Sequence, residues 1–341
     1  MLVTKQPVLQ RFWYPILKAA DVGAEPKPFT LLGKNIVVWR TPDGSLACLQ
    51  DRCCHRTAKL SLGFVEDGNI VCGYHGWTFD AAGTCVRIPQ LEDDQPISAR
   101  ARVTSYRTAE KYGYVWVALA EPLNDIPDFP EASQEGFRQV DQFYETWNIG
   151  ALRLMENSFD NAHVAYVHRG TFGNVQSPKV QAREIIQKQW GFESTNIAAV
   201  KVRGDTAQKA VATTGGETVR HSTSVWHMPF IRRTQIRYPH GLIHVLITCA
   251  TPINDTVSMI LQWVYRNDTE QDVSSAEVIA FDRAVTLEDK AIIESCEPDV
   301  PLAVLEGEEQ HMPSDRPGLV MRRMLGNLLR EHGENEQRLA G

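Results

Sequence analysis

The chain has 341 residues, 43% of them hydrophobic, and a formal net charge of −7 at pH 7. This length favours two domains, and the apolar fraction excludes a disordered chain. The net negative charge argues against a nucleic-acid partner, and no apolar run reaches the roughly 18 residues of a membrane-spanning helix.

Cysteine usage indicates a reducing compartment. The count of seven is odd and shows no paired framework, and the N-terminus lacks the apolar segment and cleavage site of a signal peptide. We therefore predict a cytoplasmic protein. Five cysteines outside the motif described below are expected to be reduced: Cys48, Cys54, Cys85, Cys249 and Cys296.

The N-terminal third predicts a small all-β domain, residues 1–125. Short apolar segments alternate with turns, such as Thr41-Pro42-Asp43-Gly44, at intervals typical of β domains. The predicted strands are residues 29–32, 36–40, 45–50, 69–72, 78–80, 84–88 and 112–119. Residues 121–130 contain three prolines and are predicted to be the interdomain linker.

The remainder, residues 126–341, predicts a second domain of α+β class. We expect an antiparallel sheet packed by helices, of the helix-grip type. The predicted strands include residues 143–149, 217–228, 234–238 and 242–251, and the predicted helices are residues 152–166, 273–294 and 318–329.

Two short loops each offer one thiolate and one imidazole, as Cys53-x-His55 and Cys72-x-x-His75. Zinc fingers usually pair two cysteines in one loop and two histidines in another, so this mixed arrangement is unusual for zinc. It fits a Rieske [2Fe–2S] cluster, in which one iron keeps two cysteines and the other takes two histidines. Cys54 is then expected to be a small buried filler, because Cys53 keeps the spacing to His55. The alternative is a colourless zinc site that stabilises a binding protein.

A second cluster lies in the predicted helix 152–166 and just beyond it. Asn157, Asp160 and His163 follow one another at helical spacing, and His168 comes five residues later. Two imidazoles and one carboxylate form the facial triad of non-haem Fe(II), which leaves positions open for O2 and substrate. Asp160 is better placed to orient His163 through a hydrogen bond than to bind the same iron.

The third ligand is expected from the helix 273–294. Spacing alone does not decide between Glu288 and Asp289, which interrupt the apolar stripe of this helix. The candidate acidic side chains of this helix are Asp282, Glu288 and Asp289.

These motifs together resemble those of the Rieske non-haem iron oxygenase alpha subunits, over nearly the whole chain. Residues 52–79 are similar to the Rieske motif, residues 156–170 to the mononuclear iron motif, and residues 287–290 to the segment with the third ligand. Within the family, the chain is most similar to the caffeine- and vanillate-type demethylases and to cyanobacterial hydroxylases that tailor guanidinium alkaloids. The resemblance favours Asp289 as the third iron ligand.

The resemblance implies a mechanism and an assembly. NAD(P)H would supply electrons through a separate ferredoxin or flavin reductase to the [2Fe–2S] cluster and then to Fe(II), which uses O2 on a small organic substrate. The family forms homotrimers in which His75 of one subunit would face Asp160 of the next. The expected reaction is monooxygenation of a C–H bond, as hydroxylation or oxidative N- or O-demethylation. An aromatic-ring dihydroxylating dioxygenase and a Rieske electron carrier without oxygenase activity are the alternatives.

The substrate pocket is expected on the sheet of the second domain. Three arginines, Arg232, Arg233 and Arg237, either bind an acidic substrate or form a solvent-exposed face of a strand. They do not identify the substrate. The candidate lining residues are Trp226, His227, Phe230, Leu246 and Thr248.

Overall fold

The computed structural model describes residues 1–92, 94–180, 184–213, 217–303 and 309–339. The chain forms two compact units: Leu9–Ile126 is one, and Met1–Val8 together with Pro127–Gly341 is the other. Residues 1–8, which the sequence analysis assigned to the first domain, thus group with the second. None of the helices in the described ranges is both long and apolar enough to cross a membrane.

The N-terminal segment is held to the larger unit by specific hydrogen bonds. The Leu2 amide donates to the Gln337 carbonyl at 2.7 Å, and the Val8 amide donates to Glu334 Oε1 at 2.7 Å. The Met1 amino group binds the Asp299 carboxylate. These hydrogen bonds tie the N-terminal segment to the C-terminal part of the chain.

The smaller unit contains three antiparallel sheets, ordered β1-β10-β9, β2-β3-β4 and β5-β6-β7-β8, which confirms the all-β prediction. Its strands are β1 (Tyr14–Lys18), β2 (Lys27–Leu31), β3 (Lys34–Arg40), β4 (Leu46–Gln50), β5 (Phe64–Glu66), β6 (Asn69–Val71), β7 (Thr78–Phe79), β8 (Cys85–Arg87), β9 (Arg107–Lys111) and β10 (Tyr114–Ala118). Its short 3-10 helices are η3 (Ala19–Asp21) and η4 (Leu60–Leu62), whereas η1 (Val3–Lys5) belongs to the larger unit and η2 (Pro7–Arg11) spans the boundary.

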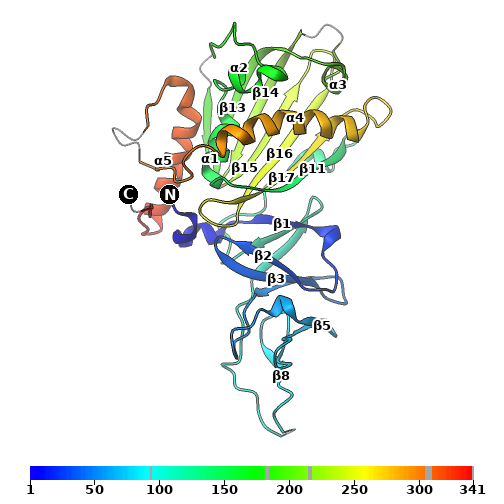
Figure 1. Ribbon diagram of the computed structural model, residues 1–341, viewed down its shortest axis with the longest axis vertical. Helices are drawn as coiled ribbons and strands as arrows, with labels where there is room; N and C mark the ends of the chain where they lie inside the picture. The colour runs from blue at the N-terminus through cyan, green and yellow to red at the C-terminus, as the bar shows by residue number, and fades with distance from the viewer. Residues whose placement is uncertain (93, 181–183, 214–216, 304–308, 340–341) are drawn as a thin grey trace. The chain divides into compact units, whose positions relative to one another are not determined.

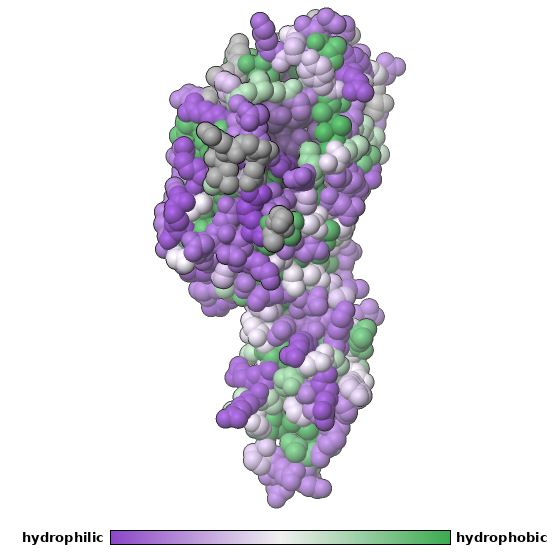
Figure 2. Space-filling view, turned by 60° about the vertical axis from the view of Figure 1, so that its left-hand side comes forward, coloured by the Kyte–Doolittle hydropathy of each residue, from purple (hydrophilic) through white to green (hydrophobic). Residues whose placement is uncertain are grey.

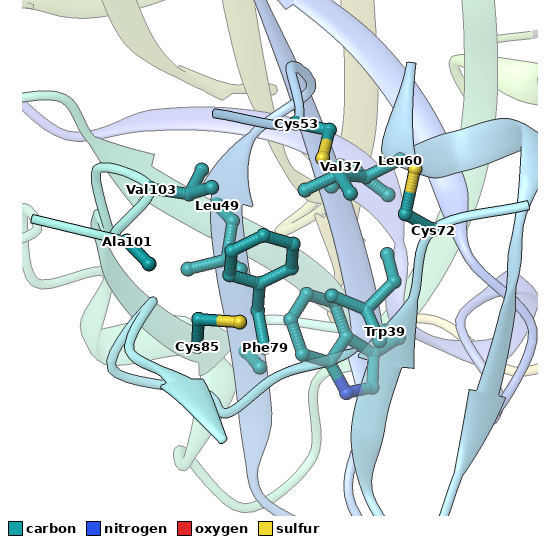
Figure 3. Packing of buried hydrophobic residues seen from close by; sticks show 12 residues of the cluster. Val37, Trp39, Leu49, Cys53, Leu60, Cys72, Phe79, Cys85, Ala101 and Val103 are labelled. Carbon is teal, nitrogen blue, oxygen red and sulfur yellow. The ribbon is translucent and has the colours of Figure 1, made fainter. Parts of the chain in front are cut away.

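A buried cluster fills the space between two of these sheets. Trp39 and Phe79 are fully buried at its centre, and the Trp39 indole N–H donates to the Gly68 carbonyl at 2.9 Å. Figure 3 shows Cys53 and Cys72 at one edge of this cluster, whereas Cys85 lies beside Phe79. The two predicted ligand cysteines are thus anchored in a packed core.

The larger unit is a seven-stranded antiparallel sheet with helices on one face, in the order β11-β17-β16-β15-β14-β13-β12. Its strands are β11 (Arg138–Trp147), β12 (Ile185–Lys188), β13 (Gly191–Lys201), β14 (Glu217–His227), β15 (Ile231–Arg237), β16 (Ile243–Pro252) and β17 (Ser258–Arg266). Its helices are α1 (Ala151–Phe159), α2 (Val164–Val167), α3 (Asp205–Ala210), α4 (Ser275–Ile293) and α5 (Arg316–Glu331), with 3-10 helices η5 (Pro130–Ala132), η6 (His168–Gly170) and η7 (Pro313–Asp315). Figure 1 shows α4 lying across the sheet, so the helix-grip prediction is confirmed.

The long helix α4 begins at a capping box. The Ser274 hydroxyl and the Glu277 side chain each bind the other residue's backbone amide, which satisfies amides that the helix leaves unpaired. The helix then runs to Ile293 without a break. Its position fixes the polar residues that it carries, including the candidate third ligand.

The predicted single helix 152–166 is wrong. Helix α1 ends at Phe159, and Asp160 takes an extended conformation with φ −75° and ψ 136°. The Asp160 carboxylate then accepts a hydrogen bond from the Ala162 amide at 2.7 Å, which competes with helical pairing and starts a turn. A separate short helix, α2, follows.

The visible surface is mixed in character. Figure 2 shows hydrophobic groups interspersed among hydrophilic ones. In the smaller unit, four large hydrophobic side chains are exposed: Leu62, Phe64, Tyr74 and Val86.

Candidate metal centres and substrate cavity

Three side chains from two distant segments converge beneath α4. His163 Nε2 lies 3.2 Å from His168 Nε2, and Asp289 Oδ1 lies 3.4 Å from the first nitrogen and 3.5 Å from the second. His163 precedes α2, His168 begins η6, and Asp289 comes from α4. Two short helical segments and one long helix therefore build a single candidate ligand set.

Each histidine is held from behind by a carboxylate. Asp160 Oδ2 lies 3.3 Å from His163 Nδ1, and Glu288 Oε2 lies 3.0 Å from His168 Nδ1. Glu288 is itself oriented by the Thr171 hydroxyl, which donates to it at 2.8 Å. A carboxylate at Nδ1 favours the proton on that nitrogen, which leaves the Nε2 lone pair free for a metal.

The electrostatics keep these groups in the state that a metal needs. Burial lowers the pKa of His168, and the carboxylates of Asp289 and Glu288 only partly oppose that effect. Burial raises the pKa of Asp160, but hydrogen bonds from His163 and Ala162 outweigh it, so this pKa lies below its ordinary value. At neutral pH the imidazole is therefore neutral and the carboxylate ionised.

The ligand atoms fit one bound ion. An ion bonded at about 2 Å to three ligands holds them roughly 3.0–3.4 Å apart, close to the observed separations. Asp289 Oδ1 is buried without a hydrogen-bond partner among the described residues, a costly state that a cation relieves. The set His163, His168 and Asp289 is also the one group of at least three acidic, histidine or cysteine side chains in the described part of the chain whose ligand atoms meet in this way.

The two predicted cluster loops share one backbone pattern. In the first, the Thr57 amide donates to the Cys53 carbonyl at 3.1 Å and the Cys53 amide to the Ala58 carbonyl at 2.8 Å. In the second, the Gly76 amide donates to the Cys72 carbonyl and the Cys72 amide to the Trp77 carbonyl, both at 2.9 Å. Each loop is thus a closed turn that begins at its cysteine.

A left-handed residue closes each of these turns. Thr57 has φ 61° and Gly76 has φ 73°, a region that L-residues rarely adopt. The shared geometry explains how loops with different cysteine-to-histidine spacing present the same ligand types.

The ligand side chains of these loops fit a shared cluster. The His55 and His75 rings lie 4.7 Å apart, and Trp77 stacks on His55 at 4.6 Å. His55 Nδ1 is buried and has no partner among the described residues. Burial raises the pKa of the Cys53 thiol to about 11, and proximity to Cys72 adds to the rise, so a metal is needed to hold the Cys53 sulfur as a thiolate.

Cys54 is half-buried and packs on the core, as expected for a filler.

A cavity of about 470 Å³ opens between α4, α1 and the sheet, directly at the iron ligands. All three candidate ligands line it, together with Asp160 and Asn157. A second hollow of about 520 Å³ lies between α1 and α5, and Asn157, Asp160 and His163 line it too. These residues therefore separate two hollows of the larger unit.

A chain of hydrogen bonds crosses the sheet beneath the cavity, with one residue from each of four adjacent strands. Arg232 donates to the Thr248 hydroxyl, which donates to Gln262 Oε1 at 2.9 Å. The Gln262 amide donates to Gln142 Oε1 at 2.7 Å, and Gln142 donates to Asp282 on α4. Each residue donates to the next in the direction from Arg232 to Asp282, so the hydrogen bonds of the network have a single direction.

The predicted pocket residues divide into two groups. Leu246 and Thr248 line the cavity, whereas Trp226, His227 and Phe230 are not among its described lining residues. Trp226 shares the cavity face of β14 but lies at its end, where it packs on Phe192.

His227 points to the opposite face of β14, toward the Phe129 ring at 6.0 Å, because side chains alternate along a strand. Phe230 is buried in the turn before β15.

The three predicted arginines also differ in role. Arg232 lines the cavity and donates to the Ser158 carbonyl at 2.7 Å. Arg233, on the other face, pairs with Glu131, and Arg237 is exposed. Sequence reasoning missed a fourth arginine, Arg220 of β14, which lines the cavity. The polar residues at alternate positions 220, 222 and 224 were the signal for it.

Comparison with known proteins agrees with this geometry. Residues 12–107 match the family described as Rieske [2Fe-2S] domain, and residues 147–331 match the vanillate O-demethylase oxygenase C-terminal domain. The chain is 30% identical to methylxanthine N1-demethylase NdmA of Pseudomonas putida, over 96% of this chain and 92% of that protein.

The chain belongs to the Rieske non-haem iron oxygenases.

Solved structures of this oxygenase family show the same fold. NdmA of Pseudomonas putida CBB5 with caffeine has a TM-score of 0.82 and 26% identity, covering 97% of this chain and 94% of that one. Dicamba monooxygenase bound to 3,6-dichlorosalicylic acid has a TM-score of 0.79 at 21% identity, with 96% and 99% covered, a likeness of fold alone.

The oxygenase is thus an oxidoreductase of the monooxygenase and demethylase type, with a Rieske [2Fe–2S] cluster, a mononuclear iron and O2 as co-substrate.

We predict that Glu288→Gln weakens iron binding about 10- to 100-fold, because an amide no longer fixes the His168 tautomer. Iron affinity is measured by competition with a chelator. Glu297→Gln, at an exposed position just beyond α4, is the matched control. An unchanged iron affinity in Glu288→Gln would show that His168 is oriented by other contacts.

We predict that His227→Leu flattens the pH dependence of stability between pH 6.5 and 4. Burial, followed by the positive charges of Arg233 and Lys188, lowers the pKa of His227 from 6.5 to about 4. Protons therefore bind the unfolded chain first as the pH falls, and stability that is complete above pH 6.5 is lost toward pH 4.

The wild-type free energy of unfolding, measured by urea titration, should fall relative to the variant by up to about 3 kcal/mol over that range. His240→Leu, at an exposed site, should keep the wild-type slope. Parallel curves for wild type and His227→Leu would contradict the prediction.

Proposed function

We propose that this oxygenase oxidises a C–H bond of a small organic substrate in the 470 Å³ cavity, by hydroxylation or by oxidative N- or O-demethylation. The observation that carries the proposal is the convergence of His163, His168 and Asp289 at the cavity wall. An iron held there supplies O2 activation when bound. In a demethylation, the oxidised methyl group leaves as formaldehyde, which gives a direct assay.

The similar proteins support this chemistry. The methylxanthine demethylases NdmA and NdmB of Pseudomonas putida are named for N-demethylation. A relative named as a dioxygenase, the 3-chlorobenzoate-3,4-dioxygenase oxygenase subunit, matches only 48% of this chain. The dihydroxylating alternative therefore has less support, and the electron-carrier alternative leaves the convergent ligand set without a use.

Asp160 is proposed to carry electrons between subunits. Its carboxylate binds His163, and the residue lines both the substrate cavity and the second hollow. In a homotrimer, this hollow would receive the partner's second cluster loop. The exposed Tyr74, within that loop, and the exposed Leu62, beside it, provide an apolar rim for such docking. A carboxylate hydrogen-bonded to a ligand imidazole on each side is a short path for an electron.

The remaining partners follow from the chemistry. Reducing equivalents are proposed to come from NAD(P)H through a separate ferredoxin or flavin reductase. A cytoplasmic location is proposed because all seven cysteines are free, as in a reducing compartment.

We predict that His163→Ala abolishes product formation while the visible spectrum of the [2Fe–2S] cluster is unchanged. The substitution removes one of three iron ligands and leaves the smaller unit intact. Product and formaldehyde are measured with a reductase and NADH, beside total iron per chain. His221→Ala, an exposed position on β14, serves as control, and substrate turnover by His163→Ala would reject the assignment.

We predict that Asp160→Asn slows reoxidation of the reduced cluster about 10- to 100-fold or more, with both metal centres still loaded. The amide keeps the shape of the side chain but loses the charge that binds His163. Stopped-flow absorbance of the reduced protein, mixed with substrate and O2, reports the rate. Reoxidation at the wild-type rate would exclude Asp160 from the electron path.

A further inference from the structure

One arginine that lines the cavity, Arg220, forms no ion pair within the described part of the chain. Arg220 lies on the cavity face of β14, and its Nε is buried. Among the described residues, none accepts a hydrogen bond from its guanidinium or forms an ion pair with it. The centroid of the Phe172 ring lies 5.0 Å from its guanidinium carbon.

Apart from Lys179, which is exposed to solvent, the other charged groups among the described lining residues have partners of their own. Arg232 donates to the Ser158 carbonyl and to Thr248. Asp160 binds His163, Asp282 accepts from Gln142, and Asp289 lies against both histidines. Among the described residues that line the cavity, no carboxylate is left over to neutralise Arg220.

An unpaired guanidinium at a half-buried position is costly, because it has given up part of its hydration without a compensating anion. Stacking on Phe172 uses the face of the guanidinium and leaves its N–H edge available. That edge is a planar fork that matches a carboxylate with two parallel hydrogen bonds.

The surroundings of Arg220 also suit an acid. Ser222 is the next residue on the cavity face of β14, and Asn196 lies opposite it on β13, so further polar groups adjoin the guanidinium. Polar and apolar residues both line the rest of the wall, and Val200, Ile236 and Leu246 belong to one hydrophobic cluster with Phe172. The cavity thus offers an apolar patch next to the ring on which Arg220 stacks.

We propose that Arg220 binds the carboxylate of the substrate, and that the oxygenase therefore acts on small organic acids with an apolar body. This inference rests on the proposed function, since it names the substrate class of the same cavity. The Phe172 ring, which Arg220 contacts, also stacks on the His168 ring. The two ring centroids are 4.9 Å apart, and the angle between the ring planes is 22°. One aromatic ring therefore separates the anion site from an iron ligand, and the fixed acid end determines which carbon is presented for oxidation.

The test measures binding by isothermal titration calorimetry of the anaerobic holoenzyme. The probes are benzoate, 4-methylbenzoate, 4-methoxybenzoate and phenylacetate, each compared with its uncharged amide. The variants are Arg220→Gln, Arg220→Lys and, as a matched control on the neighbouring strand, the exposed Arg237→Gln. The cluster spectrum, iron content and thermal unfolding of each variant confirm that it is folded.

We expect at least one acid to bind the wild type about tenfold or more tightly than its amide. Arg220→Gln should lose about 10- to 100-fold in affinity for that acid and keep its affinity for the amide. Arg220→Lys should fall between, because a point charge lacks the fork. Arg237→Gln should bind like the wild type.

A wild type that binds no acid more tightly than its amide overturns the inference, whatever the variants do, and so does an Arg220→Gln variant that keeps the preference. Turnover assays separate this inference from the proposed function. Acids that bind through Arg220 but are never oxidised contradict the proposed function alone. Oxidation of uncharged compounds alone, equally fast in Arg220→Gln, contradicts this inference alone.

Discussion

Two consecutive residues of α4 constrain the whole active site. Asp289 reaches the Nε2 atoms of both histidines, and Glu288 holds His168 at Nδ1 from the other side. His168 is therefore clamped between neighbours on one helix, about 100° apart around its axis. A small rotation or shift of α4 would break both contacts together. The antiparallel sheet, the Ser274 capping box and the break between α1 and α2 all serve to hold that helix and those histidines in register.

The smaller unit solves a similar problem by repetition. The loops that begin at Cys53 and Cys72 use the same pair of backbone hydrogen bonds and the same left-handed closing residue. Both cysteines sit in the packed core, while the histidines project further toward the surface. A cluster held in this way has buried sulfur ligands and accessible imidazole ligands, so the imidazoles form the side from which an electron can leave.

Much of this arrangement is predictable from sequence, and the failures have physical causes. Ligand types and spacings indicated both metal centres, because few other structures need thiolates and imidazoles in that order. Helical periodicity could not choose between Glu288 and Asp289, because both are acidic and the side chains of both point toward His168. The single helix 152–166 was wrong because the Asp160 carboxylate competes for backbone amides. Trp226 and His227 were misplaced because strand parity and position along the strand, rather than residue type, decide which side chains reach the cavity.

The hydrogen-bond network beneath the cavity explains where specificity resides. The network from Arg232 to Asp282 crosses four strands and joins each member to the next by a hydrogen bond. A continuous network offers little to a ligand, since breaking it would leave buried polar atoms unpaired. The network links the sheet to α4, which carries the candidate ligand Asp289. Recognition must then come from groups outside it, and Arg220, a half-buried cavity cation with no ion-pair partner among the described residues, is the strongest of these.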